Sequence, residues 1–201
     1  MILATGGEEE WGTKQRTWEA IRMASGEPDR SLAIVWAAVL EERLQAALER
    51  HLPGNTTASD VITDLFDPLK YGPLSTFAAK IDMACALGII GLGARKCLKI
   101  IARIRNDFAH KLGVRSFEHD LIRRNVEKLV YIDQALDFRE AGLVKVSFRN
   151  AEGAVVVQMG HRLENNPFDT LKGRFRESCA FLHKLIDDTK PGMRMPDLFM
   201  D

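Results

Sequence analysis

The residues of this sequence best suited to chemistry lie in the hexapeptide Arg105-Asn106-Asp107-Phe108-Ala109-His110. A guanidinium can hold a phosphate through two hydrogen bonds and stabilise negative charge on it. An imidazole titrates near neutral pH and can move a proton to or from a 2′-hydroxyl or a leaving oxygen. Together these groups could cut RNA without a metal ion. The alternative is a helix C-terminus whose polar residues pair with their neighbours and whose histidine caps carbonyl groups.

Helical geometry decides how these three side chains can meet. Asn106 and His110 are four residues apart and share a face, whereas Arg105 lies about 140° from His110 on an ideal helix. We therefore expect Arg105 and His110 to converge best if the helix ends near Ala109, or if two subunits pool their residues.

A basic stretch surrounds the hexapeptide. Residues 94–128 contain ten basic and four acidic residues, a net charge of +6, in a chain whose 28 basic and 28 acidic residues balance. The overall balance argues against a general nucleic-acid coat, which needs many phosphate contacts. A local basic face could still bind nucleic acid or phosphate, but a solvated pair of helices would show the same charges. The candidate binding residues are Arg95, Lys96, Lys99 and Arg103.

Two further patterns have simpler structural alternatives. A helix-turn-helix could comprise Phe77–Leu87, a turn at Gly88–Gly93 and Ala94–His110, although this turn is longer than the usual three or four residues. Cys179 and His183 could pair as nucleophile and base, but Cys179 lies on an apolar stripe and is more simply a core thiol. Neither metal-ligand spacing nor a phosphate-binding glycine loop occurs, so we expect no metal and no cofactor.

Composition indicates a globular protein. The 201 residues, 46% of them hydrophobic, can bury a core without disulfides. The longest uncharged runs fall short of the roughly 20 apolar residues of a membrane span, so no membrane partner is expected. Cys85, Cys97 and Cys179 are predicted to be free, buried thiols in a reducing compartment. These features predict a cytoplasmic protein.

Hydrophobic periodicity predicts mostly helices. A long helix to about Arg50 has Asp29 as its predicted N-cap. Its predicted core face is Leu32, Trp36, Val39, Leu40, Arg43, Leu44, Ala47 and Leu48, which leaves Glu41, Glu42, Gln45 and Glu49 for water. Further helices are expected from Ser59 or Asp60 to before Pro68, from Ser75 or Thr76, from Ala94 to His110, from Ser116 to about Glu140, and from Asp169 or Thr170. A short helix is also expected over residues 13–25.

Alternation of apolar and polar residues predicts a β-hairpin near 143–159. The predicted fold class is therefore mainly α, a helical bundle with this hairpin and a C-terminal helix at 169–189. We predict one domain over residues 13–189, with flexible tails at 1–12 and 190–201.

Several blocks, in order, resemble the bacterial mannitol operon repressor family. They are Gly72-Pro73-Leu74-Ser75-Thr76-Phe77, Ile81, Leu87-Gly88-Ile89-Ile90, Ile104 to His110, and Ser116-Phe117. The resemblance covers roughly residues 30–140 and implies an all-helical fold. The family has no recognised DNA-binding motif, so the resemblance implies a non-enzymatic regulator of transcription that acts through a protein partner and could form a homodimer.

The hexapeptide by itself also resembles the motif of HEPN-domain ribonucleases, which are helical, usually dimeric, and cleave RNA without metal. This second resemblance implies that Arg105 binds phosphate, His110 transfers the proton and Asn106 orients them. It offers an alternative function, that of a ribonuclease toxin or defence effector.

Overall fold

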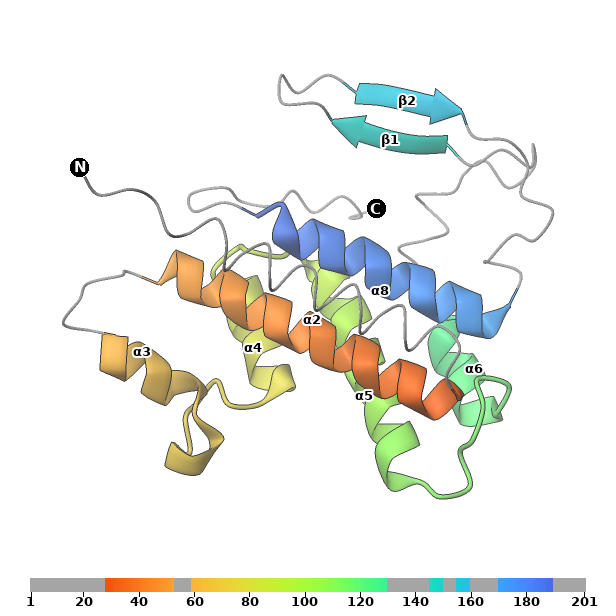
Figure 1. The fold of residues 1–201 in the computed structure, drawn as a ribbon, viewed down its shortest axis with the longest axis horizontal. Coiled ribbons are helices and arrows are strands. Elements are labelled where there is room, and N and C mark those ends of the chain that lie inside the picture. Colours follow the sequence, from red (N-terminus) through yellow and green to blue (C-terminus); the bar gives the residue numbers. More distant parts are fainter. Residues whose placement is uncertain (1–27, 53–58, 130–144, 150–154, 160–169, 190–201) are drawn as a thin grey trace.

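Helices dominate the computed structural model, which describes residues 28–52, 59–129, 145–149, 155–159 and 170–189 (Figure 1). The helical elements are α2 (Asp29–His51), α3 (Ser59–Phe66), the 3-10 helix η1 (Pro68–Lys70), α4 (Phe77–Ala86), α5 (Leu92–His110), α6 (Asp120–Val126) and α8 (Leu171–Asp187). The mainly helical fold is therefore confirmed. The predictions for residues 1–27, 130–140 and 190–201 lie outside the described residues.

Helix α2 forms one side of the core. All eight residues of its predicted apolar stripe are buried, including the guanidinium-bearing Arg43. The helix packs against α4, α5 and α8, and Figure 1 shows α8 running alongside it. The predicted stripe is thus the face that the other helices cover.

Helix α5 is the second central element, because it packs against α2, α4, α6 and α8. Its apolar residues Cys97, Ile101, Ile104 and Phe108 are all buried. Spacings of four, three and four residues place them on one side of the helix. The opposite side of α5, including the end of the hexapeptide, is left for solvent.

Three aromatic rings connect α5 to α8. Phe117 follows α5, and its ring centroid lies 5.2 Å from that of Phe108 and 5.0 Å from that of Phe175 on α8. The three side chains are almost completely buried. Their edge-on and tilted geometry is favourable for aromatic pairs. Phe117, from one of the blocks that carry the family resemblance, therefore contributes to the core.

The prediction that Asp29 caps α2 is wrong. Pro28 occupies the N-cap, and the Asp29 carboxylate instead accepts a hydrogen bond of 2.9 Å from the Phe117 backbone N–H and contacts Lys172 Nζ at 3.1 Å. The next residue, Arg30, donates to the carbonyl oxygens of Lys111 and Val114. The first turn of α2 therefore forms hydrogen bonds with the segment that connects α5 to α6. The spacing of residues in the sequence could not predict these long-range contacts.

Of the other predicted N-caps, two lie where expected and one does not. Thr76 caps α4 by accepting from Ala79 N, and Thr170 caps α8 by accepting from Gly173 N, as predicted. Helix α6 begins later than predicted, because its N-cap is His119 rather than Ser116, and its last residue is Val126. His119 Nδ1 accepts from Leu121 N at 3.3 Å.

Two short strands, β1 (Lys145–Arg149) and β2 (Val155–Met159), pair antiparallel with Lys145 opposite Met159 and Arg149 opposite Val155. Both fall in the predicted range of 143–159. The connecting residues 150–154 lie outside the described residues, so the hairpin itself stays a prediction.

The described helices include none that combines the length and apolar character needed to cross a bilayer. The three cysteines are free thiols; Cys97 and Cys179 are buried as predicted, whereas Cys85 is half-buried.

Candidate functional site

The hexapeptide forms the last turn and a half of α5. Ile104, which precedes it, and Phe108 within it are fully buried. Helix α5 continues through His110, and Lys111 is its C-cap. Because His110 is the last helical residue of α5, the separation of about 140° between Arg105 and His110 is kept within one chain. The helix ends close to Ala109, but His110 is still helical, so Arg105 and His110 diverge within one chain.

Arg105 belongs to an ion cluster between three helices. Its Nη2 lies 3.5 Å from Glu41 Oε2 on α2, while Lys80 Nζ of α4 donates to Glu41 Oε1 at 3.0 Å. The side chain of Lys80 is 7% exposed, that of Glu41 22% and that of Arg105 33%. The prediction that Glu41 faces water is therefore wrong. One carboxylate joins two cations that come from elsewhere in the chain.

Asn106 and His110 lie on the solvent side of α5. Both are exposed, and Asn106 Oδ1 accepts a hydrogen bond of 3.1 Å from Arg105 Nη1. Within the described part of the chain, the His110 side chain forms neither a hydrogen bond nor an ion pair. The structure thus brings Arg105 and Asn106 together and leaves His110 apart from them.

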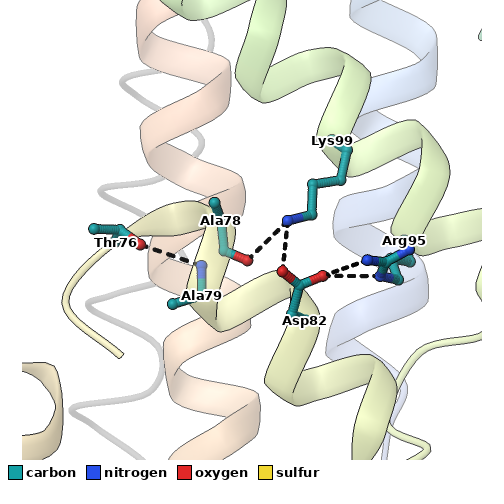
Figure 2. A network of polar contacts seen from close by, with 6 residues as sticks. All are labelled: Thr76, Ala78, Ala79, Asp82, Arg95 and Lys99. Carbon is teal, nitrogen blue, oxygen red and sulfur yellow. Dashed lines mark hydrogen bonds and ion pairs between the residues drawn. The ribbon is translucent and has the colours of Figure 1, made fainter. Parts of the chain in front are cut away.

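The predicted basic face is partly neutralised (Figure 2). Arg95 Nη2 and Lys99 Nζ each lie 2.7 Å from a carboxylate oxygen of Asp82 on α4, and Lys99 also donates to the Ala78 carbonyl. Hydrogen bonds from Lys99 and Arg95 hold the pKa of Asp82 below its ordinary value. Of the four candidate phosphate-binding residues, Lys96 and Arg103 are exposed.

The helix-turn-helix alternative gains no support from this arrangement. Helix α5, which would be the recognition helix, supplies much of the core and packs against four other helices. Two of the three basic residues at its start, Arg95 and Lys99, bind Asp82 on the neighbouring helix. A recognition helix instead presents its first turns to a DNA groove.

Cys179 is a core thiol. It is completely buried on α8, and burial raises the pKa of its thiol well above the ordinary value. A protonated, buried thiol is a poor nucleophile. The structure therefore favours the simpler interpretation of the Cys179–His183 pair.

His183 instead belongs to a polar cluster between α2 and α8. Its Nδ1 lies 3.7 Å from Asp187 Oδ2, and Arg43 Nη1 of α2 lies 3.9 Å from Asp187 Oδ1. Burial lowers the pKa of His183; Asp187 opposes this shift and Arg43 adds to it. The folded protein thus favours the neutral imidazole.

This shift predicts that the protein loses stability in mild acid. The unfolded chain binds a proton at His183 near its ordinary pKa of about 6.5, but the folded chain binds it only at lower pH. The contribution of His183 to stability is therefore complete above about pH 6.5 and is lost as the pH falls towards the folded pKa. In urea unfolding at pH 7.5 and 5.5, we expect a smaller loss for His183→Gln than for the wild type. Equal losses would contradict this assignment.

The loop after α3, which includes η1, carries exposed apolar side chains that no sequence pattern predicted. Leu69 is 88% and Tyr71 93% exposed, which makes them the most exposed large apolar residues in the described part of the chain. Tyr71 adopts a left-handed conformation with φ of 53°, which is rare for a residue with a side chain. The resemblance block that starts at Gly72 was the available signal, because it marks a turn directly beside these residues.

No group of three or more His, Cys, Asp or Glu side chains among the described residues could hold a metal ion. The arrangement therefore offers two features, an ion cluster that holds Arg105 and a loop that exposes Leu69 and Tyr71. A scan of protein-family models, a search of curated proteins and a search of solved structures each find no match to this chain.

Proposed function

We propose that this protein is a non-enzymatic regulator of transcription, similar to the bacterial mannitol operon repressor family, that acts through a protein partner. The observation that carries the proposal is the exposure of Leu69 and Tyr71 on a loop fixed by the resemblance block. Exposed apolar side chains that a rigid loop holds together are typical of protein contact sites.

The state of the charged residues supports a protein partner over a polyanion. Half of the ten basic residues in 94–128 are ion-paired within the chain: Arg95 and Lys99 with Asp82, Arg105 with Glu41, Lys111 with Asp107, and Arg123 with Glu118. Phosphate binding would have to compete with these carboxylates. The basic stretch is therefore a weaker binding surface than its net charge of +6 predicts.

Deletion of the gene, followed by transcript profiling, tests this proposal. We expect the transcripts of a defined operon to rise on deletion and to return to normal with the wild type and with His110→Ala. A Leu69→Ser/Tyr71→Ser variant, checked for an unchanged Tm, should not restore them. Unchanged transcripts on deletion, or failure of His110→Ala to restore them, would contradict the proposal.

One observation favours a second candidate, a metal-independent ribonuclease. Asn106 and His110 are exposed on one face of α5, and Asn106 holds the Arg105 guanidinium at 3.1 Å. In such a reaction the 2′-oxygen attacks the phosphorus and the 5′-oxygen leaves, while His110 transfers a proton and Arg105 stabilises the phosphate charge. Because Arg105 and His110 diverge within one chain, a second subunit would have to complete the site.

Incubation with structured RNA in EDTA tests this second candidate. A ribonuclease should yield cyclic phosphate ends, and His110→Ala should reduce the rate at least about 100-fold. Because His110 is exposed, the substitution should leave the fold intact. RNA that stays intact with the wild-type protein excludes the ribonuclease.

A further inference from the structure

Hydrogen bonds fix the backbone of the loop that exposes Leu69 and Tyr71. Leu69 N donates to Asp67 Oδ1 at 2.8 Å, Gly72 N to the Asp67 carbonyl at 2.9 Å, and Leu74 N to the Leu65 carbonyl at 2.8 Å. Buried Phe66 and Leu74 anchor the loop on either side. The loop backbone is therefore fixed, so a partner that binds it loses little conformational entropy.

The apolar side chains stand in an acidic setting. Between Ser59 and Tyr71 the chain has three aspartates, Asp60, Asp64 and Asp67, and one lysine, Lys70, a net charge of −2. The Asp64 carboxylate lies 2.6 Å from Lys70 Nζ and is 47% exposed. One turn before Asp64 on α3, the apolar Val61 is also exposed. Figure 1 shows α3 and η1 at the left edge of the view, at the margin of the helical bundle.

We propose that Leu69, Tyr71 and the neighbouring α3 aspartates bind a basic amphipathic segment of another protein. Its apolar side chains contact Leu69 and Tyr71, and its lysine or arginine residues face Asp60 and Asp64, where they compete with Lys70 for the Asp64 carboxylate. This inference rests on the proposed function, because it supplies the chemistry of the partner through which the regulator acts. Residues 59–71 carry a net negative charge, whereas the stretch 94–128 around the hexapeptide carries a net positive charge. A basic partner is therefore expected to bind here and not beside the hexapeptide.

A matched pair of peptides tests the proposal with the full-length protein. The probe is a fluorescein-labelled 12-residue helical peptide with leucines on one face and lysines on the other, and its control carries glutamates in place of the lysines. At low salt we expect the lysine peptide to bind at least about tenfold more tightly than the control, as charge complementarity requires.

Three variants locate the binding surface. Leu69→Ser/Tyr71→Ser should weaken binding of the lysine peptide at least about tenfold, and Asp64→Asn should weaken it severalfold. Leu112→Ser is the matched control, because Leu112 is 83% exposed but follows α5, and it should bind like the wild type. Equal binding by the double variant, or equal affinity for the glutamate peptide, would overturn the proposal.

Two outcomes separate this inference from the function on which it rests. If the loop binds the lysine peptide but gene deletion leaves transcripts unchanged, the proposed binding surface is supported and the proposed regulatory function is wrong. If deletion changes transcripts and the double variant restores them fully, regulation stands and this surface is wrong. Self-association that the double variant abolishes would identify a second copy as the occupant and overturn the proposed foreign partner.

Discussion

Glu41→Gln is expected to lower the free energy of unfolding by about 3 kcal/mol, because it leaves a buried cation without its counter-ion. Lys80 Nζ has its ion pair with Glu41, and the Lys80 side chain is almost completely buried between α2 and α4. Glutamine keeps the shape of the side chain and an acceptor oxygen but removes the negative charge. Urea unfolding followed by circular dichroism measures the loss.

A second substitution shows whether the buried charge is the cause. Lys80→Met in the Glu41→Gln background removes the uncompensated cation and should restore most of the lost stability. Asp82→Asn is the matched control, since Asp82 also joins two cations but is about half exposed; it should lose no more than about 1 kcal/mol. A greater loss for Asp82→Asn than for Glu41→Gln would show that burial does not set the cost.

Gly72→Ala is the second substitution with a large expected effect. A Cβ atom at Gly72 would lie 2.5 Å from the Leu65 carbonyl oxygen, 2.7 Å from its carbonyl carbon, and closer still to the Asp64 carbonyl oxygen. All three atoms are backbone atoms of α3, so the helix end would have to move. We expect a loss of at least about 2 kcal/mol, together with weaker hydrogen bonds in the Leu69–Tyr71 loop.

Gly113→Ala provides the control for this substitution. A Cβ at Gly113 would meet no atom within 4 Å, so alanine should leave stability unchanged or raise it by about 0.4–1 kcal/mol through the unfolded chain. Thermal and urea unfolding of both variants give the comparison. If Gly72→Ala is as stable as Gly113→Ala, the close approach of the loop to α3 does not constrain this position.

The sequence was sufficient where local chemistry decides the structure. Spacing of apolar residues predicted the buried face of α2. Residue type placed the starts of α4 and α8 at Ser75 or Thr76 and at Asp169 or Thr170, and in each case the threonine is the N-cap. The divergence of Arg105 and His110 also follows from helical geometry alone. These predictions need no knowledge of other parts of the chain.

The sequence failed where a polar side chain finds a distant partner. Glu41 lies at the edge of a polar face, and nothing in its own helix shows that Lys80 and Arg105 come to it from α4 and α5. Asp29 is a good cap by residue type, yet its carboxylate serves the Phe117 N–H instead. Such pairs decide which side chains of the candidate site are open to a ligand. The sequence could therefore predict the residues of the site but not which of them are already ion-paired.

The hydrogen bonds between the first turn of α2 and the α5–α6 connection affect the rate of unfolding. The hydrogen bond between Asp29 and Phe117 N joins residues 88 apart, and those of Arg30 span 81 and 84 residues. Closing loops of this length costs entropy, so such contacts form late in folding. Asp29→Ala should therefore accelerate unfolding much more than it slows refolding. Contacts of this kind would slow the unfolding of the folded core without guiding its assembly.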